Sequence, residues 1–178
     1  FESLGIDTWG VDFGLLDEHG DLLESAVHYR DDRTIGMQEE VFKAISKEEV
    51  YNLTGNQFEN FNTIFQLYSL VQKRPWILER ADTLLFNYFL TGEKKAEYTM
   101  ASTTQLMDAK NKVWSDRILD ALRIPKKLLP EIVPSGTVVG TLRSSICEEL
   151  GVESAKVIAI AGHDTQSAVV SVPTQEED

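Results

Sequence analysis

The sequence predicts an α/β fold built as a single domain. Apolar runs typical of strands open the chain, and helical and strand patterns then alternate along the rest of it. A last apolar run, residues 157–161, interleaves β-branched residues with alanines, which is typical of a fully buried strand. At 178 residues the chain is long enough to bury one core, so residues 1–178 are treated as one domain.

The first elements are predicted to form a β-hairpin. Residues 4–7 and 11–16 read as strands, and residues 18–21 supply the chemistry of a turn. Residues 22–29 are expected to return as a third strand that pairs with the second.

Capping residues and apolar spacing predict a series of helices after the hairpin. Ser46 and Glu49 form a capping box at the start of one helix, which Gly55 ends. Pro75 ends the helix after that one, and Ser115 can cap a later one. The predicted helices cover residues 39–45, 46–55, 63–71, 115–122 and 144–150, and a strand is expected over 81–86 with a helix end at 90–92.

The composition argues against several classes of function. Acidic residues outnumber basic ones by 29 to 17, a net charge of −12, which argues against binding the phosphate backbone of nucleic acids. No apolar run reaches the roughly 18 residues that a membrane span needs, so no membrane partner is expected. With Cys147 as its one cysteine and no signal peptide, the chain is expected in the reducing cytoplasm.

One carboxylate occupies a position where open α/β sheets bind their ligands. Asp164 follows the buried strand after Gly162 and His163, which makes it a candidate general base. The competing hypothesis is that Asp164 or Thr165 only caps the helix that starts there. On this stretch alone the capping hypothesis is favoured, because Asp, Ser and Thr are common at such junctions.

A second polar cluster follows the first strand. The carboxylates of Asp7 and Asp12, the indole of Trp9 and the small Gly10 together suit a hydroxyl-rich ligand. A hairpin edge with a core Trp and solvated acids would have the same residues, and the sequence leaves both interpretations open.

Other polar segments carry weaker signals. The mixed charges of residues 28–33 are typical of a solvated loop with weak surface ion pairs. Residues 57–62 could supply amide contacts to a ligand, although Asn62 is equally well placed to cap a helix. No HxxxH, CxxC or Gly-rich phosphate loop is present, so the sequence offers no metal-binding motif.

Short segments along nearly the whole chain follow the order found in one known family. They are residues 5–13, 29–34, 54–58, 61–63 with 66–67, 90–92, 101–106 and 162–165. Together they resemble the FGGY carbohydrate kinases. Two details resemble the L-rhamnulose kinase branch of that family: Trp9-Gly10-Val11 after the first strand, and Gln66 where many sister kinases carry Lys.

The resemblance implies a fold, a reaction and a set of residue roles. The fold would be a ribonuclease-H-like (actin-like ATPase) domain, and the reaction a phosphoryl transfer from Mg-ATP to the 1-hydroxyl of L-rhamnulose. Gly10, His163, Asp164 and Thr165 would contact the sugar, and Asp164 would be the catalytic base. The resemblance therefore outweighs the capping hypothesis for Asp164. Two alternatives stay open, namely a kinase for another ketose or polyol and a non-catalytic sugar-binding module that kept the fold.

Four departures from the family pattern limit this interpretation. The phosphate-binding hairpin of the family would precede Phe1, and the second domain would follow Asp178. We therefore expect a piece of a longer protein, inactive by itself, in which other parts hold most of the ATP and Mg²⁺. The family also has several more residues between Phe86 and Asn87, and Met100 stands where Asn is usual.

Overall fold

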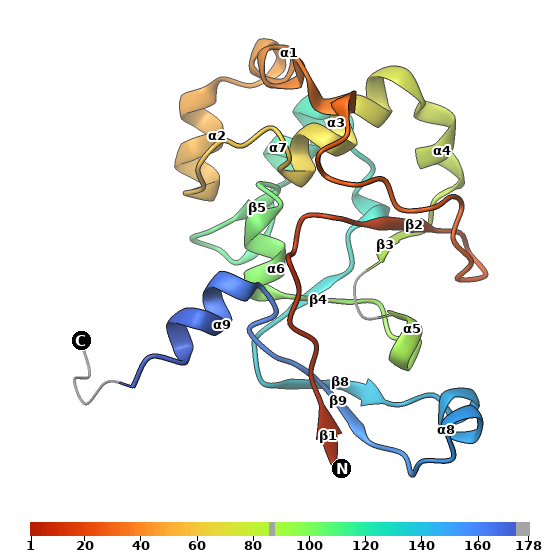
Figure 1. The fold of residues 1–178 in the computed structure, drawn as a ribbon. Coiled ribbons are helices and arrows are strands. Elements are labelled where there is room, and N and C mark those ends of the chain that lie inside the picture. The colour runs from red at the N-terminus through yellow and green to blue at the C-terminus, as the bar shows by residue number, and fades with distance from the viewer. Residues whose placement is uncertain (86–87, 174–178) are drawn as a thin grey trace.

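A mixed three-stranded sheet joins the beginning of the chain to its last strand (Figure 1). The structure, a computed structural model, describes residues 1–85 and 88–173. In this sheet β9 (Lys156–Ala159) lies between β1 (Ser3–Leu4), which is parallel to it, and β8 (Thr137–Thr141), which is antiparallel. Helix α8 (Ser144–Leu150) connects β8 to β9.

Three separate two-stranded sheets complete the β-structure of the described residues, and their labelled strands lie nearer the helices in Figure 1. The pairs β2–β3 and β5–β6 are antiparallel, whereas β4–β7 is parallel. Their bounds are β2 (Gly14–Leu16), β3 (Thr83–Leu85), β4 (Lys95–Glu97), β5 (Met107–Asp108), β6 (Val113–Trp114) and β7 (Glu131–Val133).

The main core lies among the helices drawn at the top of Figure 1, and α3 is at its centre. Phe65, Ile64 and Leu67 of α3 are fully buried, because this helix has neighbours on nearly every side. A smaller apolar cluster of Val133, Val139, Val157 and Ala159 lies under the three-stranded sheet. The helices are α1 (Met37–Ala44), α2 (Lys47–Thr54), α3 (Thr63–Lys73), α4 (Pro75–Arg80), α5 (Tyr88–Thr91), α6 (Tyr98–Thr103), α7 (Asp116–Leu122) and α9 (Asp164–Val170), with short 3₁₀ turns η1 (Asp32–Thr34) and η2 (Lys126–Leu128).

The predicted caps of α2 and α7 are confirmed, but the capping box at Ser46 is only half formed, because the Glu49 carboxylate accepts from Arg117 instead of the Ser46 N–H. The Ser46 hydroxyl accepts a hydrogen bond from the backbone N–H of Glu49 at the start of α2, and Gly55 ends the helix with φ +69°. Ser115 caps α7 in the same manner. Pro75 ends α3 near its expected position, but it also begins α4 as the first helical residue, where its missing N–H costs nothing.

The predicted third strand of the hairpin is wrong. Only one isolated bridge, Leu16 to Leu22, joins residues 22–29 to β2, and β2 pairs with β3 instead. The three residues of β2 are all buried, so they need an apolar partner on both sides. Leu22 is exposed and Glu24 is paired with Arg74, so this stretch serves as a loop.

The last strand is buried on one face instead of both. Val157 and Ala159 point into the small core, while Ile158 and Ile160 remain partly exposed. The strand predicted over residues 81–86 is found as β3, and the junction between Phe86 and Asn87 lies outside the described residues. Among the described helices none combines the length and apolar character needed to cross a membrane.

Candidate active site

The loop after β1, called the first loop below, and the loop after β9 lie side by side. The Thr8 N–H donates to the Gly162 carbonyl at 2.8 Å, and the Asp164 N–H donates to the Thr8 carbonyl at 3.1 Å. These bonds form a parallel bridge between Thr8 and His163, beyond the ends of the two strands. The structure therefore brings together two of the polar clusters that the sequence identified separately, at the carboxyl ends of parallel strands.

Gly10 lies where no larger residue fits. Its φ is +77°, and a Cβ atom placed on it would lie 2.9 Å from Cδ2 of His163 and 3.1 Å from Sδ of Met100. The Gly10 carbonyl accepts a 3.4 Å hydrogen bond from the Thr103 hydroxyl of α6. Gly10 thus keeps the first loop in contact with both His163 and α6.

Asp164 is the first residue of α9 and is partly open to solvent. His163 occupies the N-cap position, so the hypothesis that Asp164 or Thr165 caps this helix is wrong. Oδ1 of Asp164 accepts from the Thr165 N–H at 2.7 Å and lies 3.6 Å from Nε2 of His163. Within the described part of the chain, Oδ2 of Asp164 accepts no hydrogen bond, which leaves it available to a ligand.

Three aromatic side chains lie beside the first loop, of which Trp9 is exposed while Tyr29 and Phe61 are partly buried. Trp9 has 59% of its surface exposed, so the interpretation as a core Trp is wrong. Its ring centroid lies 6.2 Å from that of Tyr29, which makes an edge contact with Phe61 at 5.6 Å. Oδ1 of Asp12 accepts from the Tyr29 N–H at 2.7 Å, so this carboxylate holds the aromatic loop in place.

Gln66 is completely buried, and its side chain holds neighbouring backbone segments in place. Its Nε2 donates to the carbonyls of Val11 and Phe61 at 2.8 and 2.7 Å, and its Oε1 accepts from the Arg33 guanidinium. Burial lowers the pKa of Arg33 from its usual value. Gln66 therefore fixes the segment after Gly10 and has no exposed surface with which to touch a sugar.

Glu97 is a functional candidate that the sequence reasoning missed. It ends β4, is only 4% exposed, and accepts a 3.4 Å hydrogen bond from the Gly162 N–H. A single acidic residue in a three-residue strand gives no periodic signal, and its partners lie far away along the sequence.

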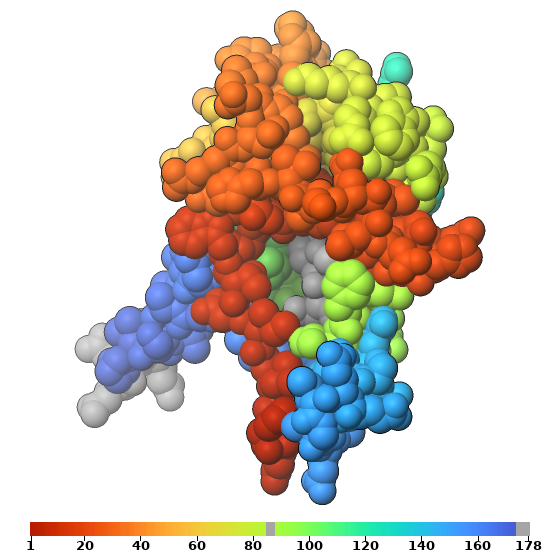
Figure 2. All heavy atoms as spheres, turned by 45° about the vertical axis from the view of Figure 1, so that its right-hand side comes forward, coloured from red at the N-terminus to blue at the C-terminus, as the bar shows by residue number. Residues whose placement is uncertain are grey.

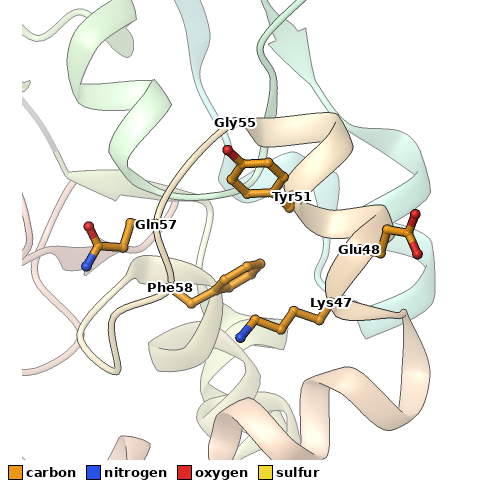
Figure 3. Close-up of a pocket in the computed structure, with 6 residues that line it drawn as sticks. All are labelled: Lys47, Glu48, Tyr51, Gly55, Gln57 and Phe58. Carbon is orange, nitrogen blue, oxygen red and sulfur yellow. The ribbon is translucent and has the colours of Figure 1, made fainter.

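Figure 2 shows the red N-terminal segment crossing one face of the molecule, with the blue α9 emerging beside it. A cavity of 790 Å³ is lined in part by Thr99, Ile160 and Gln166, and none of Gly10, His163, Asp164 and Thr165 lines it. A second cavity of 810 Å³ opens between Lys47, Tyr51 and Phe58 at α2, and none of the predicted site residues lines it (Figure 3).

Among the described residues, no group of three or more His, Cys, Asp or Glu side chains could hold a metal ion.

Comparison with known proteins supports a single family. The model of the N-terminal domain of the FGGY family of carbohydrate kinases matches residues 1–171. A rhamnulokinase of Oceanobacillus iheyensis is 50% identical over 98% of this chain and 38% of its own length. A rhamnulokinase of Halalkalibacterium halodurans is 48% identical over 96% of this chain and 38% of its own length. The chain thus spans well under half the length of these curated relatives.

Solved structures support the fold. A ligand-bound xylulose kinase from Lactobacillus acidophilus superposes with a TM-score of 0.85 at 21% identity, over 95% of this chain and 36% of that one. A Plasmodium falciparum glycerol kinase with ADP gives a TM-score of 0.80 at 22% identity, over 96% of this chain and 35% of that one. The expected ribonuclease-H-like domain is therefore confirmed as the fold.

Proposed function

The chain belongs to the FGGY family of carbohydrate kinases, and on that premise we propose that the whole protein transfers a phosphoryl group from ATP to the 1-hydroxyl of L-rhamnulose. Support comes from relatives named rhamnulokinase that are 50% and 48% identical to this chain. Trp9-Gly10-Val11 and Gln66 also resemble that branch of the family.

The observation that carries the proposal is the contact between the two loops. Gly10 and His163 are close enough that only the absence of a Cβ atom permits the approach. Asp164 follows His163 directly, and its Oδ2 is available to accept a hydrogen bond from a ligand. A sugar bound there would meet hydrogen-bonding groups from both loops at once.

In the proposed reaction Asp164 is the general base. Its carboxylate accepts the proton of the 1-hydroxyl as the oxygen of that hydroxyl forms its bond to phosphorus. Gly10, His163 and Thr165 would hold the sugar so that this hydroxyl faces Asp164. Because phosphoryl transfer depends mainly on positioning and charge neutralisation, fixed loops suit this chemistry.

Members of this family use ATP and a divalent metal ion. Mg²⁺ that is bound together with ATP is commonly held by one or two carboxylates, water and the phosphates themselves, so a cluster of three side-chain ligands, which the described residues lack, is not required for it. We assign no residue of this chain to Mg²⁺ or to the adenosine of ATP.

A kinase for another ketose or polyol remains the alternative within the family, and a sugar-binding module without catalysis is the alternative outside it. A coupled assay of the full-length protein with L-rhamnulose, D-xylulose and glycerol separates the three. The proposal expects kcat/KM to be highest for L-rhamnulose, because a site built to hydrogen-bond particular hydroxyls rejects analogues that leave its polar groups unpaired. Phosphorus NMR of the product should show the phosphate at C1. Equal kcat/KM values for the three substrates, or no turnover at all, would refute it.

A further inference from the structure

A buried carboxylate lies directly behind the candidate active site. Glu97 is 4% exposed, and within residues 1–85 and 88–173 it forms no ion pair. Moving a carboxylate out of water is costly unless hydrogen bonds replace the lost solvation. The fold therefore has to supply donors at this position.

The donors come first from the start of α6 and from the turn before β8. Oε2 of Glu97 accepts from the N–H groups of Thr99 and Met100 at 2.9 and 3.2 Å, and from the Thr99 hydroxyl at 2.5 Å. Oε1 accepts from the hydroxyl of Ser135. These bonds cap α6 and tie it to the neighbouring β7–β8 turn.

The same carboxylate also reaches the loop that carries Asp164. Its Oε2 accepts from the Gly162 N–H at 3.4 Å. The Thr99 hydroxyl, which donates to Glu97, accepts from the His163 N–H at 3.4 Å. The two amides that precede Asp164 are therefore both connected to Glu97, one directly and one through Thr99.

We propose that Glu97 is a positioning residue that holds the Gly162–His163 backbone and thereby sets the place of the Asp164 carboxylate. The inference rests on the proposed function of Asp164. Thr8 binds the other side of the same loop through the Gly162 carbonyl and the Asp164 N–H. Glu97 and Thr8 together leave this loop little freedom.

The test is a double-mutant cycle in the full-length enzyme between Glu97→Gln and Asp164→Asn. Gln keeps the size of Glu but loses its charge, which weakens the hydrogen bonds made to it. Since a displacement of about 1 Å at a reacting group can cost roughly 100-fold, we expect Glu97→Gln to lower kcat by about 10-fold or more. In the Asp164→Asn background the same change should lower the residual rate by less than about 3-fold, because it acts through a group that has been removed.

A second pair of variants keeps the test decisive if Glu97→Gln folds poorly. Thr99→Val removes the hydroxyl that links Glu97 to His163, whereas Thr99→Ser retains it. We expect Thr99→Val to lower kcat by about 10-fold and Thr99→Ser to stay within about 2-fold of wild type. Thr83→Val is the matched control, because it removes another buried hydroxyl, one that bonds to the carbonyls of Leu84 and Leu128.

The outcomes separate this inference from the proposed function. If the losses for Glu97→Gln and Asp164→Asn multiply, Glu97 acts independently of Asp164 and the inference is wrong. It is also wrong if Thr83→Val lowers kcat as much as Thr99→Val does. A near-normal kcat for Asp164→Asn alone would refute the proposed base instead.

Discussion

Replacing Gly10 with Ala should damage the site by a route that the structure specifies. The added Cβ would lie 2.9 Å from Cδ2 of His163, whereas ordinary van der Waals contact begins at 3.4 Å. His163 or the first loop must therefore shift by about half an ångström (3.4 − 2.9) to relieve the contact. Because Asp164 follows His163 directly, we expect kcat/KM for the sugar to fall by about 10-fold or more.

Strain from the backbone must be separated from this displacement, and Gly36 offers a matched control. Its φ is +76°, close to the +77° of Gly10, but a Cβ atom on Gly36 would meet nothing within 4 Å. Both Ala variants should lose about 1–2 kcal/mol of stability, because an L-residue is strained in the left-handed region. Only Gly10→Ala adds a collision at the site.

The assay is steady-state kinetics of the full-length enzyme, with melting temperatures measured for both variants. We expect both variants to lose melting temperature, Gly10→Ala at least as much as Gly36→Ala because of its added contacts, and kcat/KM to fall in Gly10→Ala alone. Equal kinetics in the two variants would show that the close approach of Gly10 to His163 has no role in the reaction.

Two further predictions concern stability. Gln66→Met should destabilise the protein by about 1–3 kcal/mol for each of the carbonyls of Val11 and Phe61 that loses its donor. Gln72→Met on the exposed face of α3 should be nearly neutral in the same unfolding measurement, and equal losses would contradict this view of Gln66. The backbone N–H of Asn111, followed by its side chain, lowers the pKa of Asp108 below the usual 3.8, so an NMR titration should give a midpoint below that value. Because the pKa is depressed in the folded state, the stability it confers is present above pH 3.8 and is lost as the pH falls through the lower value; Asp108→Asn should abolish that dependence.

The elements that the sequence predicted well are those with local signals. The N-cap Ser46 and the stop at Gly55 define α2 through bonds between near neighbours, and Ser115 caps α7 in the same way. The strands of two or three residues, such as β4 and β5, are too short for a periodic pattern to reveal them. The prediction of a third strand at residues 22–29 was wrong because strand pairing is decided by contacts distant in sequence. The buried β2 pairs with β3 instead.

In the candidate site, too, the residues with local signals could be predicted, whereas the contacts between distant segments could not. Asp164 could be singled out because it follows a strand and a glycine, and Gly10 because it stands in a polar cluster. Their meeting depends on the parallel pairing of β1 with β9, which no local pattern encodes. Glu97 could not be found, because its role comes from donors on Thr99, Ser135 and Gly162 that only the fold gathers.

The most direct test of the central claim is the Asp164→Asn variant of the full-length enzyme. Asn keeps the size of Asp and one acceptor oxygen, so sugar binding measured by calorimetry should change little. It cannot take up a proton as a carboxylate does, so kcat from a coupled assay should fall by about 10²–10⁴-fold. A variant with near-normal kcat would contradict the account, because Asp164 would then have no part in proton transfer.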